Sequence, residues 1–85
     1  MQITELTLDN FADEVLFDEN VLVAFRSEGR SPMEAFSSKT LQNSGLKLCS
    51  VDIDAQQELA TLLEISHAPA TIEFRNGRVV KHYKK

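Results

Sequence analysis

A buried strand that runs directly into a helix start constrains the fold of this chain more than any other feature. The apolar run Val21 to Phe25 is short, β-branched at two positions and bounded by polar residues, which is typical of a buried strand. Ser31, Pro32 and Glu34 then supply a hydroxyl N-cap, a proline at the first helical position and a carboxylate at the third. We therefore expect the chain to turn from strand to helix at this loop, as α/β proteins do.

Apolar periodicity predicts further strands and helices on both sides of this unit. The predicted strands are Ile3 to Thr7, Val21 to Arg26, Leu46 to Ile53, Thr71 to Arg75 and Arg78 to Lys84. Three helices are predicted. The first begins at Asp9 or Asn10 and has the apolar face Phe11, Val15 and Leu16. The second runs from Ser31 to Asn43 with Met33, Phe36 and Leu41, and the third begins at Asp54 with Gln57 and carries Leu59, Leu62 and Leu63. The expected fold is α/β, in the order β-α-β-α-β-α-β-β, with a mixed sheet of four to five strands and three helices.

The dipeptide Asn76-Gly77 between the last two predicted strands is a strong signal for a two-residue hairpin turn. In the strand before it, polar and apolar residues alternate, so one face carries Thr71, Glu73 and Arg75. A strand covered on both faces would read as continuously apolar. We therefore expect this sheet face to be exposed to solvent or covered by a partner.

Chain length allows a single small core. With 85 residues, the whole of 1–85 is expected to form one domain. The longest strongly apolar run has five residues, too short to span a bilayer, so no membrane partner is expected. The segment Met1 to Glu5 lacks the basic start and apolar stretch of a secretory signal, which favours a cytoplasmic location.

The formal net charge of −4 hides an uneven distribution of charge. Eight of the thirteen acidic residues lie within the first 34, whereas five of the nine lysines and arginines lie between Arg75 and Lys85. A basic end can attract nucleic acid, but the whole domain is acidic and its aromatic residues are not interleaved with the basic ones. Lysines that protect an exposed sheet edge explain the segment better, so no nucleic-acid partner is expected.

Five segments, in the right order and at about the right spacing, resemble the thioredoxin family over residues 3 to 80. They are Leu6-Thr7 with Phe11, Val15 and Leu16; Val21 to Phe25 followed by Pro32; Asp52-Ile53-Asp54; Ala68-Pro69-Ala70; and Phe74-Arg75-Asn76-Gly77. A gap of a few residues after the second helix accommodates the rest. The resemblance implies a thioredoxin-like fold in a short form, without the helix that the family adds after the last strand.

The resemblance also implies that the redox chemistry of the family is missing here. The positions of the attacking and resolving thiols fall on Arg30 and Met33, and neither side chain can attack a disulfide. The family's two tryptophans at this loop and its buried, proton-transferring aspartate and lysine fall on Arg26, Gly29, Ala24 and Ser50. We therefore expect that the protein is not an enzyme, and no residue is assigned a catalytic role.

Cys49, the only cysteine, lies within a predicted strand, where nothing in the sequence lowers the pKa of its thiol. A small core hydrophobe is the favoured interpretation, and a residual thiol function is the alternative. The two histidines, His67 and His82, have no metal-ligand spacing to Cys49 or to each other. No metal or other cofactor is expected.

The first candidate binding site is the former active-site loop. It consists of Gly29, Arg30, Ser31, Pro32 and Met33. An arginine at a helix N-terminus opposes the helix dipole, which is explained either by an anion held beside the exposed N–H groups or by a side chain that simply points into water.

The second candidate is the loop formed by His67, Ala68 and Pro69. The resemblance implies a cis bond before Pro69, a position against the first loop, and backbone pairing of Ala68 with extended peptides. The alternative is that the cis turn only shapes the entry to the next strand. His67 is either a group that titrates near neutral pH or an exposed loop residue without a role.

The sequence therefore favours a redox-inactive thioredoxin-like protein that binds a protein or peptide through these two loops. One alternative is a protein related to thiol-disulfide oxidoreductases that acts through Cys49 or a partner's cysteine. Another is a structural subunit of a larger assembly. A weak homodimer is also expected, because Val80 is predicted to lie opposite Glu73 on the exposed sheet face.

Overall fold

Five strands and two helices make up the described part of the chain. The computed structural model describes residues 3–31, 36 and 45–84. The elements are β1 (Ile3–Glu5), η1 (Ala12–Leu16), β2 (Asn20–Arg26), β3 (Lys47–Asp52), α2 (Gln57–Leu62), β4 (Ala70–Arg75) and β5 (Arg78–Lys84). Every predicted strand is present. The predicted helix from Ser31 to Asn43 lies outside the described residues, apart from Ser31 and Phe36.

The strands form one mixed sheet in the order β1-β3-β2-β4-β5. β1 and β2 each run parallel to β3, whereas β4 is antiparallel to β2 and β5 is antiparallel to β4. β2 lies in the middle, and residues 21–25 are buried throughout. A continuous apolar run suits this position, because a central strand is covered on both faces. The predicted α/β fold with a mixed sheet is confirmed.

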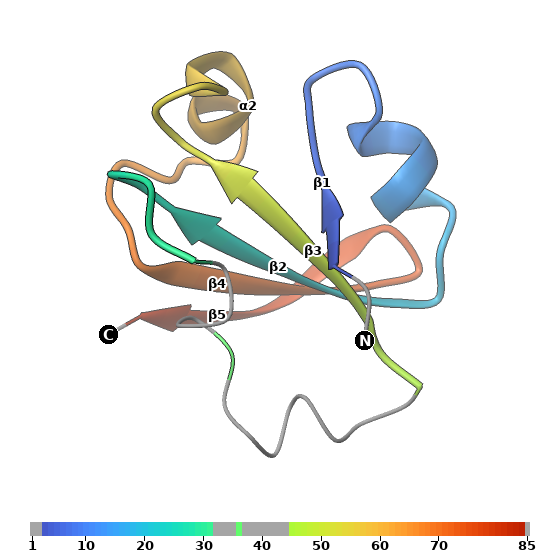
Figure 1. Cartoon of the computed structure of the whole chain (residues 1–85). Coiled ribbons are helices and arrows are strands. Elements are labelled where there is room, and N and C mark those ends of the chain that lie inside the picture. Colours follow the sequence, from blue (N-terminus) through green and yellow to red (C-terminus); the bar gives the residue numbers. More distant parts are fainter. Residues whose placement is uncertain (1–2, 32–35, 37–44, 85) are drawn as a thin grey trace.

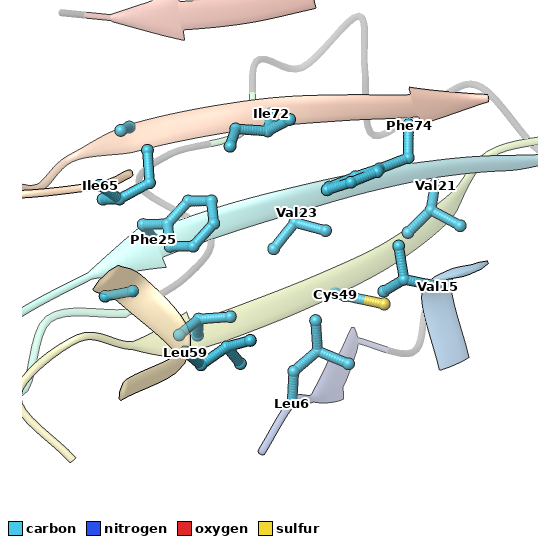
Figure 2. Close-up of a cluster of buried hydrophobic side chains, with 13 residues drawn as sticks. Leu6, Val15, Val21, Val23, Phe25, Cys49, Leu59, Ile65, Ile72 and Phe74 are labelled. Carbon is cyan, nitrogen blue, oxygen red and sulfur yellow. The ribbon is translucent and has the colours of Figure 1, made fainter. Parts of the chain in front are cut away.

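Two hydrophobic clusters cover the two faces of the sheet. Figure 1 shows both described helices on one face, and Figure 2 shows the larger cluster on that face. It contains Leu6, Val15, Val21, Val23, Phe25, Cys49, Val51, Leu59, Ala60, Ile65, Ala70, Ile72 and Phe74. The smaller cluster consists of Leu22, Ala24, Phe36 and Leu48. Neighbouring residues of β2 alternate between the clusters because successive strand side chains point to opposite faces.

The turn before η1 is held differently from the prediction. Neither Asp9 nor Asn10 caps the helix, and no side chain at the cap position makes a hydrogen bond. The Asn10 side chain instead accepts the N–H of Thr7 at 2.7 Å and donates to the carbonyl oxygen of Glu5 at 3.1 Å. Asn10 therefore stabilises the turn that leads out of β1 and leaves the helix end uncapped.

The apolar face of η1 also differs from the predicted one. Val15 is buried, and Phe11 packs edge-on against Phe74 with ring centroids 5.8 Å apart. Leu16, which was predicted to share this face, is 40% exposed. The reason is that η1 is a π-helix, whose i to i+5 hydrogen bonds widen the turn and break the 3.6-residue spacing behind the prediction.

α2 begins at Gln57, three residues after the predicted cap. Asp54 does not cap the helix, because its carboxylate accepts the N–H of Glu28 at 2.8 Å. The carboxylate of Asp52 closes the local turn instead, accepting the N–H groups of Asp54 and Ala55 at 3.0 and 3.4 Å. These contacts fix the loop between β3 and α2 to the loop after β2.

Leu62 was predicted to face the core and is 70% exposed. Leu59 and Ala60 are buried, and Leu63 packs against the larger cluster. These three residues define a stripe along the helix. Leu62 lies about 110° around the helix axis from the middle of this stripe and is therefore left outside it. Neither described helix is long and apolar enough to cross a bilayer.

The turn between β4 and β5 matches the predicted hairpin. Asn76 and Gly77 have φ values of 52° and 79°, as a type I′ turn requires. The N–H of Asn76 donates to the carbonyl oxygen of Glu19 at 2.8 Å. A Cβ atom on Gly77 would lie 2.8 Å from the carbonyl oxygen of Leu16. The hairpin tip is therefore fastened to the segment that follows η1.

A bulge changes the predicted pairing of this hairpin. The register shifts between Glu73 and Phe74, so that Glu73 pairs with Lys81 and Phe74 pairs with Val79. Val80 was predicted to lie opposite Glu73, and this is wrong because Val80 is the extra residue of the bulge. Thr71 is also buried rather than exposed; it pairs on β2 with Ala24, which belongs to the smaller hydrophobic cluster. The argument for self-association through Val80 is thereby removed.

Candidate functional site

Three loops meet at one end of the sheet, as Figure 1 shows. They are residues 27–31 after β2, 53–56 after β3 and 66–69 before β4. The strand register brings them together: Arg26 at the end of β2 pairs with Asp52, and Phe25 pairs with Ala70 at the start of β4. The two loops singled out from the sequence therefore flank adjacent strands.

Six of the eight predicted site residues lie in the described part of the chain. Gly29, Arg30, Ser31, His67 and Pro69 are exposed, and Ala68 is half-buried. Pro32 and Met33 lie outside the described residues. The described six are thus available at the surface, at the same end of the sheet.

The loop after β2 has an unusual backbone. Glu28 and Gly29 have φ values of 55° and 70°, and the N–H of Arg30 donates to the carbonyl oxygen of Ser27 at 3.1 Å. The hydrogen bond from the N–H of Glu28 to Asp54 anchors the loop on one side. Apart from the two adjacent residues, no atom of the described part of the chain lies within 4 Å of the position that a Cβ on Gly29 would take. The top of the loop therefore faces open space.

The loop before β4 contains a cis peptide bond between Ala68 and Pro69. The hydroxyl of Ser66 and Nδ1 of His67 form a hydrogen bond of 3.4 Å within the loop. Ala70 follows directly and is buried against Phe25 of β2. The backbone of Ala68 and Pro69 is consequently held close to the end of the central strand.

Arg26 joins three strands beneath these loops. Its Nε donates to Oγ of Ser50 on β3 at 3.0 Å, and its guanidinium forms an ion pair with Asp52 at 3.5 Å. The other terminal nitrogen pairs with the carboxylate of Glu5 on β1. Only 17% of the Arg26 side chain is exposed. A planar guanidinium can hold two carboxylates and a hydroxyl at once, so this arrangement needs arginine rather than lysine.

The thiol of Cys49 lies in the core, away from the loops. Figure 2 shows Cys49 on β3 among Leu6, Val15 and Val21, and none of its surface is exposed. Burial raises the pKa of the Cys49 thiol to about 11, although the nearby charge of Lys47 works in the opposite direction. The thiol is therefore protonated at neutral pH.

No family model and no curated protein matches this sequence. Its structure, however, is similar to solved structures over nearly its whole length. The thioredoxin of Malassezia sympodialis matches with a TM-score of 0.78 at 20% identity, over 96% of this chain and 77% of that one. The thioredoxin of Trypanosoma brucei brucei gives 0.81 at 16% identity, over 98% and 78%.

A third similar chain belongs to a solved structure that concerns the thiol resolving mechanism in yeast mitochondrial 1-Cys peroxiredoxin via the glutathione/thioredoxin systems. It has a TM-score of 0.80 at 16% identity, over 96% of this chain and 82% of that one. The fold is thioredoxin-like. In this thioredoxin-like frame, the loops 27–31 and 66–69 occupy the end of the sheet where the resemblance places an active-site loop and a cis-proline loop.

Two buried positions of the thioredoxin-like sheet lie next to this end. Ala24 is fully buried, and Ser50 is 2% exposed. They are neighbours in register on β2 and β3, and the resemblance places the family's buried aspartate and lysine at these two positions. Neither side chain ionises, and the hydroxyl of Ser50 is engaged by Arg26.

Sequence reasoning missed two residues that organise this end. Arg26 was noted only as a replacement for a tryptophan, and Asp54 was assigned to a helix cap. Their contacts join segments 21 to 26 positions apart in the chain, so neither is visible in a local pattern. The available signal was charge: Arg26 ends one predicted strand and Asp52 lies one residue before the end of another, and opposite charges meet where adjacent parallel strands end.

Proposed function

We propose that this thioredoxin-like protein is a redox-inactive module that binds a protein or peptide through the loops 27–31 and 66–69. The observation that carries the proposal is the position of the only thiol: Cys49 is fully buried in the core, and both loops lack cysteine. Disulfide exchange begins with attack by a thiolate. A protonated, inaccessible thiol is unsuited to that step.

Binding of an extended chain needs main-chain groups rather than thiols. Ala68 lies at the entry to β4, where the resemblance implies backbone pairing with a peptide. The open space above Gly29 leaves room for a chain that crosses from β4 toward β2. Both features support peptide binding without redox chemistry.

Redox inactivity is tested by an insulin-reduction assay with dithiothreitol as the electron source. We expect the protein to accelerate precipitation of the insulin chains no more than a Cys49→Ser variant does. Turnover clearly above that variant would contradict the proposal and favour a thiol-based activity through Cys49.

Binding is tested by titrating the ¹⁵N-labelled protein with reduced, carboxymethylated ribonuclease A, an extended polypeptide without free thiols. We expect the amide resonances of Gly29, Arg30 and Ala68 to shift, and those of the hairpin tip to stay in place. Unchanged resonances in both loops would contradict the proposal.

A substitution in the open space sharpens this test. Gly29→Asn keeps the positive φ, because asparagine adopts the left-handed region more easily than other side chains, and it fills the space above the loop. We expect it to weaken binding of the carboxymethylated chain at least about threefold. Arg78→Asn, on exposed β5 at the sheet edge, is the matched control and should bind as the unmodified protein does.

A further inference from the structure

A shallow groove runs along the solvent side of α2 and begins at the candidate site. One hollow of about 470 Å³ is lined by Leu8, Asp54, Ala55, Gln56, Gln57 and Glu58. A second, of about 400 Å³, is lined by Gln57, Glu58, Thr61 and Leu62. Because they share Gln57 and Glu58, the two hollows form one surface, which we call the α2 groove.

The α2 groove exposes apolar side chains that the fold does not bury. Leu8 is 42% exposed and Leu62 is 70% exposed. Leu8 is fixed in place through its N–H, which donates to the side-chain oxygen of Gln56 at 3.2 Å. Exposed leucines at the two ends of one groove provide contact area for the aliphatic part of a partner side chain.

The charge of the α2 groove is negative and largely unbalanced. Asp54 and Glu58 both line it, and the Glu58 carboxylate has no hydrogen bond or ion pair in the described part of the chain. Arg26, the basic residue that pairs with Asp52 just before this loop, is already shared with Glu5. A cationic partner group would therefore meet the Glu58 carboxylate without having to displace a basic side chain, next to an Asp54 carboxylate that, among the described residues, holds only the N–H of Glu28.

Asp54 connects the α2 groove to the candidate site. The same carboxylate that lines the first hollow accepts the N–H of Glu28, next to the open space at Gly29. A chain crossing from Ala68 past Gly29 would reach the α2 groove at Asp54. The groove thus continues the path of an extended peptide beyond the three loops.

We propose that the α2 groove receives a lysine or arginine side chain from the same partner segment that pairs with Ala68. Its aliphatic stem packs on Leu8, and its charged end meets the carboxylates of Asp54 and Glu58, as long basic side chains do at apolar surfaces with a polar rim. This inference rests on the proposed function and names the chemistry of the peptide: an extended segment with a basic residue flanked by small or apolar ones.

A second copy of this chain is the competing occupant, since β5 carries basic residues. The lysine in the middle of that strand is already engaged, however: Lys81 stacks over the ring of Tyr83 at 4.9 Å, and Tyr83 donates to Glu73 at 3.0 Å. Insertion of Lys81 into the groove of another copy would have to break these contacts. A separate basic segment carries no such cost.

Three synthetic peptides test the proposal: acetyl-Val-Thr-Val-Lys-Val-Thr-Val-amide and its analogues with norleucine or glutamate in place of lysine. Each is titrated into the ¹⁵N-labelled protein at low ionic strength. We expect the lysine peptide to bind about three- to tenfold more tightly than the norleucine peptide, and the glutamate peptide to bind most weakly. The amide of Leu8 should shift with both the lysine and the norleucine peptide, because both side chains carry the aliphatic stem, whereas the amide of Glu58 should shift with lysine and stay in place with norleucine.

Charge-neutralising variants identify the groove as the cause. Glu58→Gln should remove the preference for lysine, whereas Glu19→Gln, the same change at an exposed position before β2, should keep it. An unchanged preference in Glu58→Gln would overturn the inference. Equal binding of all three peptides, with shifts at Gly29 and Ala68, would overturn it while the proposed function stands.

Two further outcomes separate the alternatives. Shifts at Glu58 without any at Gly29 or Ala68 would overturn both the shared path and the proposed function. Concentration-dependent shifts at Glu58 and Lys81 without peptide would overturn the inference in favour of a second copy.

Discussion

Two glycine turns lie at opposite ends of the central strand β2, and their surroundings differ. At the hairpin end, Gly77 is pressed against the carbonyl oxygen of Leu16, only 2.8 Å from where a Cβ would stand. At the other end, no atom of residues 3–31, 36 and 45–84, apart from the chain neighbours of Gly29, lies within 4 Å of the corresponding position. Both have positive φ, so the backbone alone does not distinguish them.

The contrast separates a structural end of the sheet from an accessible one. The hairpin tip is also tied to the start of β2, where Nε of Arg75 donates to the side-chain oxygen of Asn20 at 3.2 Å. The loop at Gly29 is joined to the loop after β3 through the bond from Glu28 to Asp54. A protein that binds through one end of its sheet can leave that end open while the other secures the fold.

Gly77→Ala should give the largest effect. The new methyl group would meet backbone rather than a movable side chain, and alanine also disfavours the positive φ. We expect the free energy of unfolding, measured by urea titration, to fall by about 2–4 kcal/mol. A loss below about 1 kcal/mol would show that the hairpin tip is not fastened as described.

Titration of Cys49 tests the difference between the core and the open end of the sheet, because the only thiol of the sequence belongs to the core. Its pKa is raised from 9.0 to about 11 in the folded protein. Between these values the unfolded chain loses its thiol proton while the folded protein keeps it, so stability is present in full below pH 9 and falls as the pH rises toward 11. We expect this loss to reach about 2–3 kcal/mol.

Cys49→Ala is the control for that titration. Urea midpoints of the two proteins, compared below pH 9 and near pH 11, cancel the contributions of tyrosine and lysine residues common to both. Parallel pH dependences would contradict a buried, protonated thiol.

Arg26→Met should have an intermediate effect and tests whether the strands beneath the open loops are held together. Removing the guanidinium leaves the buried hydroxyl of Ser50 without its partner and separates Glu5 from Asp52. We expect a loss of about 1–2 kcal/mol in the free energy of unfolding. Arg78→Met, on the exposed edge strand, should change it by less than about 0.5 kcal/mol. Equal losses of stability in the two variants would contradict a role for Arg26 in holding β1, β2 and β3 together.

Gly29→Ala should have the smallest effect. Its methyl group meets open space, so only the backbone preference of alanine against positive φ remains. We expect a loss of about 1 kcal/mol by the same urea titration. A loss as large as that of Gly77→Ala would abolish the distinction between the two ends.

Local patterns in the sequence predicted all five described strands and the hairpin turn. The run Val21 to Phe25 needs only its own residues to indicate a buried strand, and Asn76-Gly77 indicates its turn type by backbone preference alone. Cys49 was likewise expected in the core on the character of its strand, and it lies there.

Features that depend on pairing between distant segments, or on an irregular helix geometry, were not predictable in this way. The bulge at Val80 arises from a register shift that the alternation of side chains does not encode. The π-helical turn of η1 exposes Leu16 because its hydrogen bonds skip an extra residue. The Arg26 cluster requires the order β1-β3-β2, which becomes known only when the sheet is assembled.

The buried position of Cys49 has a practical consequence for measuring the motions of this protein. Because it is the only thiol and has no exposed surface, a thiol reagent can label it only during moments when the core opens. The labelling rate, divided by the rate for a free thiol, gives the equilibrium constant of that opening. Figure 2 shows Leu6 and Val15 beside the sulfur, so we expect the opening that admits the reagent to be a loosening of the segment from β1 to η1. A simple absorbance assay of thiol labelling would therefore report the fraction of molecules in which this edge of the domain is open.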